Sequence, residues 1–111
     1  MGTVTHNEYS RLRANILNRI ERLPELTAFG LLKGFSAALA VAERHAEDKG
    51  EKWIEQDAFD HLMHADLHIN YTDDDGDELF HGIDKLDDDG LPHLDHACCR
   101  LLFAVAKREG M

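Results

Sequence analysis

The chain has few of the features that mark secreted or membrane-spanning proteins. Its two cysteines, Cys98 and Cys99, are adjacent and cannot bridge each other in ordinary disulfide geometry. No basic segment followed by an apolar one stands near the start, as a secretory signal would require. The longest apolar stretch, residues 28–42, is short for a membrane span and is interrupted by Lys33. We expect a reduced, cytoplasmic chain with buried thiols and no membrane partner.

Basic residues are scarce as well. Lysine and arginine together number 12 against 22 aspartate and glutamate residues, so the formal net charge is −10 at pH 7. This charge argues against a nucleic-acid backbone or an anionic membrane surface as a partner, because both are negatively charged. A small anion chelated to a metal ion remains compatible, since the cation brings the opposite charge.

Only two prolines interrupt the helix-forming sequence, and Pro24 and Pro92 both suit the first turn of a helix. Thr5 and Glu8 have the spacing of a capping box, and Gly50 is typical of a helix end. Apolar residues recur at helical spacing between these signals. The predicted fold for the single domain 1–111 is all-α, a four-helix bundle with helices at about 5–22, 24–49, 57–71 and 92–109.

The predicted helix at 24–49 is apolar nearly all the way round, so it is either central in the bundle or shared between chains. Gly30 and Gly34 are four residues apart, and a second helix could approach the backbone closely there. This spacing fits a crowded core and a dimer seam equally well. Because one small bundle cannot cover so many apolar faces, we expect a homo-oligomer.

An acidic stretch separates the last two predicted helices. The sequence Asp-Asp-Asp-Gly occurs at 73–76 and again at 87–90. Neither copy has the ligand order of an EF-hand calcium loop, because Glu78 stands where the glycine is needed. We therefore expect a long, solvated acidic loop over residues 72–91, which could act as a lid.

Histidine is abundant, with eight residues in the chain. His61, His64 and His68 recur at helical spacing in the third predicted helix, and His93 and His96 do so in the fourth. We expect each set to form a stripe at the border between core and solvent. Placed face to face, the two stripes would surround one crevice.

The apolar residues of these helices predict which faces are buried. In the last helix, the periodicity places an apolar face in the core: Leu94, Ala97, Cys98, Leu101 and Val105. Arg100 then shares the flanking stripe with the histidines. In the third helix, the same reasoning assigns four residues to the core edge: Ala58, Leu62, Ala65 and Ile69.

Imidazoles at such spacing are typical of a metal site, since they bind zinc, iron, manganese or nickel, and nearby carboxylates add charge. The His-Glu-x-x-His signature of metalloproteases is absent. Border histidines bonded to carboxylates or carbonyls are the simpler alternative and stay open. The predicted metal ligands are His61, His64, His68, His93, His96 and Asp60.

Cations near these stripes predict a phosphate site. Arg100 follows His96 by one helical turn, and its guanidinium could donate two hydrogen bonds to a phosphate. Lys49, Lys52 and Trp53 lie between the second and third predicted helices. The His-Asp dipeptide of HD phosphohydrolases, the carboxylate spacing of MazG pyrophosphohydrolases and a Ser/His/Asp or Cys/His nucleophile arrangement are all missing.

The stretch from Lys49 to Phe103 resembles the small phage and bacterial proteins named dATP/dGTP diphosphohydrolase. Their pattern is a Gly-then-Trp turn, a helix ending in histidine, an acidic loop and a helix start of the form Asp-x-x-Gly-x-x-His-Leu-x-His-Ala. The matching residues are Gly50, Trp53, His68, Asp87, Gly90 and the run from His93 to Ala97. The family's arginine before the histidine of the third helix is Leu67 here, and the acidic loop is longer.

The resemblance implies metal-dependent hydrolysis of purine (deoxy)nucleoside triphosphates to monophosphate and pyrophosphate, with a small-molecule nucleotide as the partner. It implies a divalent ion, Mg or Mn with Zn as the alternative, and the host cytoplasm as the location of a phage-encoded chain. The catalytic residues it implies are His68, His93, His96 and Asp66, with Arg100, Lys49, Lys52 and Trp53 at the phosphates. A non-catalytic binder that sequesters a nucleotide or a signal derived from one, a metal-binding helical protein and a purely structural helical protein are the alternatives.

Overall fold

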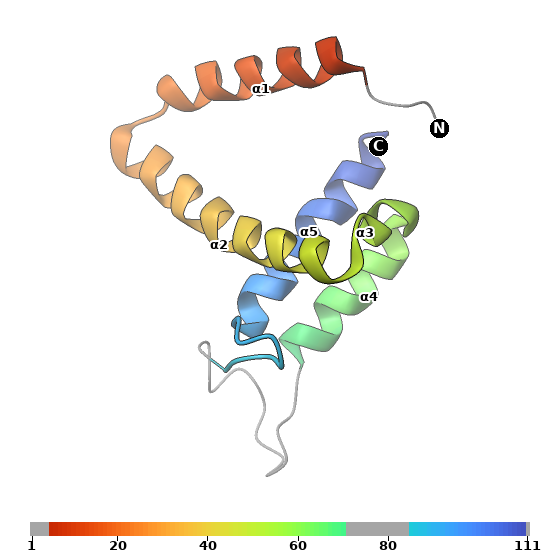
Figure 1. Ribbon diagram of the computed structural model, residues 1–111. Helices are drawn as coiled ribbons and strands as arrows, with labels where there is room; N and C mark the ends of the chain where they lie inside the picture. The colour runs from red at the N-terminus through yellow and green to blue at the C-terminus, as the bar shows by residue number, and fades with distance from the viewer. Residues whose placement is uncertain (1–4, 71–84, 111) are drawn as a thin grey trace. The chain divides into compact units, whose positions relative to one another are not determined.

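The computed structural model describes residues 5–70 and 85–110, and within these ranges the chain is all-α (Figure 1). The helices are α1 (His6–Glu21), α2 (Glu25–Lys49), α3 (Lys52–Glu55), α4 (Ala58–Ile69) and α5 (His93–Arg108). The all-α prediction is confirmed. The expected four-helix bundle is corrected, because the residues after Gly50 form a further short helix, α3, which makes five helices in the described part of the chain.

The helix ends follow from local sequence. The Oγ1 atom of Thr5 accepts a hydrogen bond from the backbone N–H of Glu8 at 3.1 Å, which caps α1. Gly50 ends α2 with a φ of 70°, in the left-handed region that glycine adopts without strain. Asp57 and Asp60 exchange side-chain and backbone hydrogen bonds and so form a capping box at the start of α4.

By its contacts, the chain divides into two compact units, Met1–Ser36 and Ala37–Met111. The first contains α1 and the N-terminal part of α2, and none of its described side chains is buried. The second contains the rest of α2, α3, α4 and α5. The prediction of a single domain over residues 1–111 stays a prediction.

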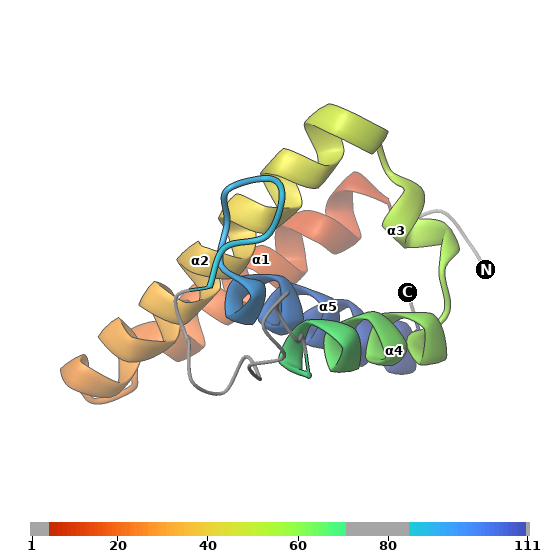
Figure 2. The same ribbon diagram turned by 90° about the horizontal axis from the view of Figure 1, so that it is seen from below.

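In the C-terminal unit, α4 and α5 pack side by side in both views (Figures 1 and 2). Ala65 of α4 and Ala97 of α5 are each 1% exposed, and such small side chains allow two helices to approach closely. Ala38 and Val41 of α2 are buried together with Cys99. Partly buried apolar residues that pack against this cluster complete the core: Ala42, Trp53, Leu91, Cys98 and Phe103.

The expected buried faces of α4 and α5 are confirmed for Ala65 and Ala97 but wrong for the large apolar residues. Leu94, Leu101 and Val105 are 46%, 41% and 46% exposed, and Leu62 is also exposed. The full set of buried side chains of α5 includes the polar stripe: His93, His96, Ala97, Cys99, Arg100 and Ala104. Periodicity located both stripes, but hydrophobicity alone could not show that the polar stripe finds its partners inside this unit.

Residues 71–84, which include most of the expected acidic loop with Glu78 and the Asp-Asp-Asp-Gly copy at 73–76, lie outside the described residues. The second copy forms a tight turn before α5. The backbone N–H of Asp87 donates to the carbonyl of Leu91 at 2.8 Å, and Leu86 and Pro92 form an isolated antiparallel bridge. Gly90 adopts a φ of 83°, which explains why glycine stands at that position.

Candidate functional site

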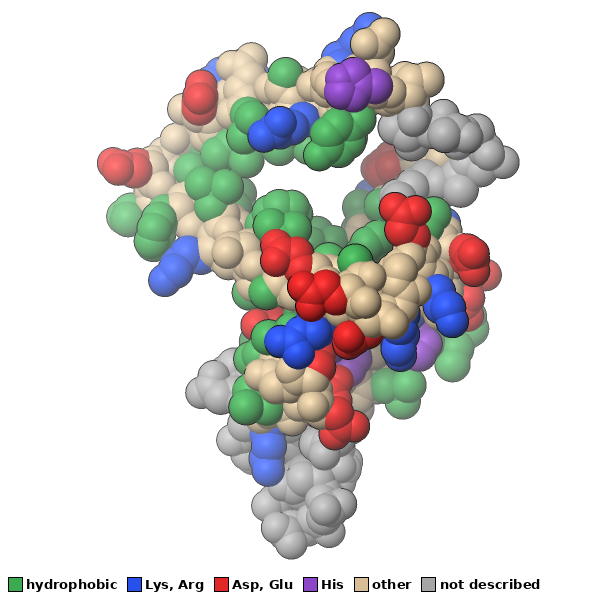
Figure 3. Space-filling view, viewed as in Figure 1, with side chains coloured by type: hydrophobic (Ala, Val, Ile, Leu, Met, Phe, Trp, Pro, Cys, Tyr) green, Lys and Arg blue, Asp and Glu red, His purple; other side chains and the backbone are tan. Residues whose placement is uncertain are grey.

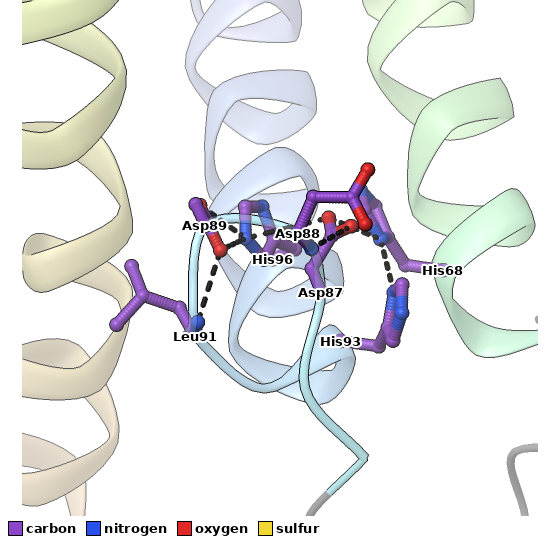
Figure 4. A network of polar contacts seen from close by, with 7 residues as sticks. All are labelled: His68, Asp87, Asp88, Asp89, Leu91, His93 and His96. Carbon is purple, nitrogen blue, oxygen red and sulfur yellow. Dashed lines mark hydrogen bonds and ion pairs between the residues drawn. The ribbon is translucent and has the colours of Figure 1, made fainter.

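The imidazoles of α4 and α5 face each other. His68 of α4 lies opposite His93 and His96 of α5, with ring centroids 5.1 Å and 4.7 Å away (Figure 4). The Nδ1 atoms of His68 and His93 are 2.9 Å apart, so one ring donates a hydrogen bond to the other. The predicted meeting of the two histidine stripes is confirmed for these three residues.

The turn before α5 brings carboxylates to the same place. The Nε2 atom of His96 lies 2.8 Å from Oδ2 of Asp89 and 3.6 Å from Oδ2 of Asp87. Asp89 is held from the other side because its Oδ1 accepts the backbone N–H of Leu91 at 2.9 Å. Burial pushes the pKa of Asp89 upward, but the Leu91 N–H and His96 outweigh burial and keep this pKa below its ordinary value.

His68, Asp87 and His96 form the cluster that could hold a metal ion. One ligand atom from each lies within 4.8 Å of the others. Oδ2 of Asp87 is 3.8 Å from Nδ1 of His68 and 3.6 Å from Nε2 of His96. Tetrahedral bonds of the usual length to nitrogen and oxygen place ligand atoms about 3.3 Å apart, so a small rearrangement would close this set around an ion.

The electrostatics of His68 favour the metal-binding form of its ring. Burial first, and then the neighbouring His96, lower the pKa of His68 to about 4. His68 is therefore neutral at physiological pH, and neutral imidazole is the form that binds metals.

A pocket of about 580 Å³ opens beside this cluster, and the residues that line it all belong to the C-terminal unit. This volume is in the range of small-molecule sites. The pocket wall carries four cations: Arg44, Lys49, Lys52 and Arg100. Its acidic residues are Asp48, Asp87, Asp88 and Asp89, and its aromatic rings are His45, Trp53, His64, His68 and His96. The four residues predicted to bind phosphate, Lys49, Lys52, Trp53 and Arg100, thus line one pocket.

Arg100 is the most buried of these cations, with 3% of its surface exposed. Its Nη2 donates to Oε1 of Gln56 at 2.7 Å, and its guanidinium lies 4.8 Å from the ring centre of Trp53. Its Nε has no hydrogen-bond partner among the described residues. A guanidinium in a pocket wall is suited to an anionic ligand because of its positive charge.

His45 continues this polar wall. Its ring stacks on Trp53 with centroids 3.8 Å apart, and its Nε2 is buried without a hydrogen-bond partner in the described ranges. Burial first, and then the charges of Lys49 and Arg100, lower the pKa of His45. The imidazole of His45 is therefore neutral at physiological pH.

Other predicted site residues lie elsewhere. His61 is fully buried, bonds the Trp53 carbonyl through Nε2 at 3.0 Å and stacks on Phe103, so it is a core residue away from the pocket. Asp60 belongs to the capping box of α4, and Asp66 accepts a hydrogen bond from Asn70. These three residues are absent from the pocket lining.

Two further predicted site histidines, His64 and His93, lie near the metal cluster but are not part of it. His64 lines the pocket but does not belong to the metal cluster, and His93 touches the cluster through His68. Burial first, and then Arg100, lower the pKa of His64.

Sequence reasoning did not include Asp87, Asp89 and Gln56 among the site residues. The Asp-x-x-Gly pattern at 87–90 was a usable signal for Asp87, because the turn at Gly90 folds it back towards α5. Gln56 carries no recognisable signal, since a single glutamine after a short helix is common.

No protein-family model, curated protein or solved structure matches the chain. The resemblance to the dATP/dGTP diphosphohydrolases therefore stays a prediction from the motifs.

Proposed function

We propose that the chain is a metal-dependent pyrophosphohydrolase that converts purine (deoxy)nucleoside triphosphates to monophosphate and pyrophosphate. The observation that carries this proposal is the metal-capable cluster His68–Asp87–His96 in the wall of a pocket that also holds four cations. A triphosphate with a bound divalent ion needs both features: ligands for the ion and positive charges for the remaining phosphate oxygens.

The donor set indicates which ion would fit. Two imidazoles and one carboxylate suit Mn, Fe, Co or Zn better than Mg, which prefers oxygen ligands and retains its water molecules. His68, Asp87 and His96 would hold the ion. Once bound, the ion would neutralise phosphate charge and lower the pKa of a water molecule.

The chain's own groups would bind and orient the substrate. Arg100 would place its positive charge beside the phosphates from the pocket wall, and Gln56 and Trp53 fix its guanidinium in place. Lys49 and Lys52 would neutralise further phosphate charge from the other end of the pocket wall, where α2 ends and α3 begins.

Proton transfer would fall to a neutral imidazole in the pocket. The lowered pKa of His64 leaves its ring able to accept a proton, and the ring does not belong to the metal cluster. The oxygen of a water molecule would attack the α-phosphorus while His64 takes the proton of that water. The bond from the α-phosphorus to the bridging oxygen would break, and pyrophosphate would leave with the electron pair.

The test is pyrophosphate release from a panel of nucleoside and deoxynucleoside triphosphates with Mn, Co, Zn or Mg. We expect turnover with a transition-metal ion, abolished in His96→Gln. His6→Gln is the matched control, because His6 is an exposed histidine of α1. If the chain binds a nucleotide tightly and the nucleotide is recovered intact, the function is sequestration and the proposal of hydrolysis is refuted. No affinity for any nucleotide would refute both functions.

A further inference from the structure

The N-terminal unit exposes an unusual amount of apolar surface. Ten large apolar side chains between residues 9 and 35 are at least 38% exposed: Tyr9, Leu12, Ile16, Leu17, Leu23, Leu26, Phe29, Leu31, Leu32 and Phe35. Figure 3 shows hydrophobic side chains along both helices of this unit. Helix α1 and the part of α2 before Ala37 bury none of their described side chains, so this unit lacks the hydrophobic stabilisation that holds helices together.

The area involved matches that of a protein interface. Large apolar side chains present roughly 180–220 Å² each, so the exposed fractions of these ten sum to on the order of 1,000 Å². A stable protein–protein interface takes about 800 Å² from each partner. The apolar surface of this unit is therefore sufficient for one such interface.

Two glycines indicate what kind of partner covers it. Gly30 and Gly34 stand inside α2, where each costs about 1 kcal/mol of helix stability relative to alanine. A Cβ atom built on either one would meet nothing within 4 Å, so packing of the described chain does not require them. Glycines one turn apart do allow the backbone of another helix to approach closely.

We propose that the chain dimerises through this unit, with α2 of one copy crossing α2 of a second copy at Gly30 and Gly34. An α2–α2 crossing is self-complementary, as a two-fold symmetric interface requires. The apolar stripe of α1 would pack beside the crossing. A hollow of about 420 Å³ would receive side chains of the partner, and its lining combines apolar residues with two arginines: Ile16, Arg19, Ile20, Arg22 and Leu23.

A membrane is the other occupant to consider, because α2 is long and apolar enough to be a candidate span by length and composition alone. However, Ala38 and Val41 of α2 are buried against Cys99 in the C-terminal unit. The part of α2 before them, Glu25–Ala37, is about 20 Å long at 1.5 Å per residue, whereas the hydrocarbon core measures about 30 Å.

Sedimentation equilibrium of the full chain tests the proposal. We expect a mass of twice 12.6 kDa at micromolar concentration. Gly30→Leu and Gly34→Leu, singly and together, should raise the dimer dissociation constant about tenfold or more. Because leucine is a far better helix former than glycine, the variants should keep or increase the helical content by circular dichroism.

Ser36→Leu is the matched control, since position 36 is exposed and lies roughly opposite Gly34 on the helix. It should leave the dissociation constant unchanged. If the copies associate only because their surfaces are apolar, the glycine-to-leucine changes would lower the dimer dissociation constant. That result would overturn the proposal. A monomer at micromolar concentration would also overturn it, and flotation of that monomer with phosphatidylserine vesicles would identify lipid as the occupant.

Discussion

The Nδ1 atoms of His68 and His93 lie 2.9 Å apart across the contact between α4 and α5. Only one proton fits between two nitrogen atoms at this distance, so at least one of the two rings is neutral. The lowered pKa of His68, caused first by burial and then by His96, agrees with this arrangement. The partly buried imidazole of His68 and the buried imidazole of His93 therefore act as a hydrogen-bonded pair, and the pair adjoins the carboxylate of Asp87.

Removal of one ligand from the metal cluster should strongly weaken metal binding. We expect Asp87→Asn and His96→Gln each to weaken binding of Co²⁺ or Mn²⁺ by about 100-fold or more, because two ligands hold an ion far less tightly than three. Titration calorimetry measures the affinity, and the visible spectrum of bound Co²⁺ reports its coordination. His6→Gln should bind as the wild type does. Equal affinity in His96→Gln would exclude His96 as a ligand.

Arg100 should contribute to ligand binding more than to stability. Arg100→Met keeps the volume of the side chain and removes a buried charge, so the free energy of unfolding should change by about 1 kcal/mol or less. Affinity for a nucleoside triphosphate should fall about tenfold or more. Arg108→Met is the control, since Arg108 is an exposed cation of the same helix. A large loss of stability without loss of affinity would make Arg100 structural.

The free energy of unfolding of core and surface variants of α5 tests whether the leucines of this helix are exposed. Ala97→Leu should lower the free energy of unfolding by about 1–3 kcal/mol, because Ala97 is 1% exposed and in the core has no room for a larger side chain. Leu101→Ala should cost less than about 1 kcal/mol, since Leu101 remains 41% exposed. Urea unfolding at low protein concentration provides both values. A cost of about 2–5 kcal/mol for Leu101→Ala would place this residue in a packed interior.

Stability should decrease on acidification. Folded His68 has a pKa of about 4, whereas the unfolded residue titrates near its ordinary value of 6.5. Between these values the unfolded state binds more protons, so the free energy of unfolding falls as pH falls and levels off below about pH 4. The part due to His68 should be about 1–2 kcal/mol after allowance for solvent screening.

Urea unfolding at several pH values in EDTA measures this dependence. His45, His61 and His64 shift in the same direction, because burial lowers their pKa values as well. The difference between wild type and His68→Gln therefore isolates His68. Parallel curves for the two proteins would contradict the prediction.

The two cysteines should differ in reactivity. Burial first, and then Cys98, raise the pKa of Cys99 to about 11, so the reactive thiolate of Cys99 is scarce at neutral pH. Iodoacetamide should label Cys98 faster than Cys99 in the folded protein and both at similar rates in urea. Mass spectrometry of the digested protein distinguishes the adjacent sites after fragmentation. Faster labelling of Cys99 would show that the core around α5 opens readily.

Much of the fold was predictable because its signals are local. Thr5, Gly50 and Pro92 mark helix ends through backbone hydrogen bonds or a fixed φ, and these depend on few neighbours. The short helix α3 was missed, since a single turn has no periodicity to detect. Spacing predicted that His68, and likewise His93 and His96, lie on a stripe of their helices, and the hypothesis that the stripes face each other is confirmed for these residues. Spacing could not show the core position of His61.

The sequence by itself determined the four longer helices and the two histidine stripes, because helical periodicity and capping act over a few residues. Only the tertiary structure decided which stripe faces inward. Alanines at the contact of α4 and α5 bring the helices close enough for the imidazoles to bond each other, and the leucines are left outside. The turn at Gly90 then adds Asp87 and Asp89, a juxtaposition that depends on contacts between segments and is not encoded in any one of them.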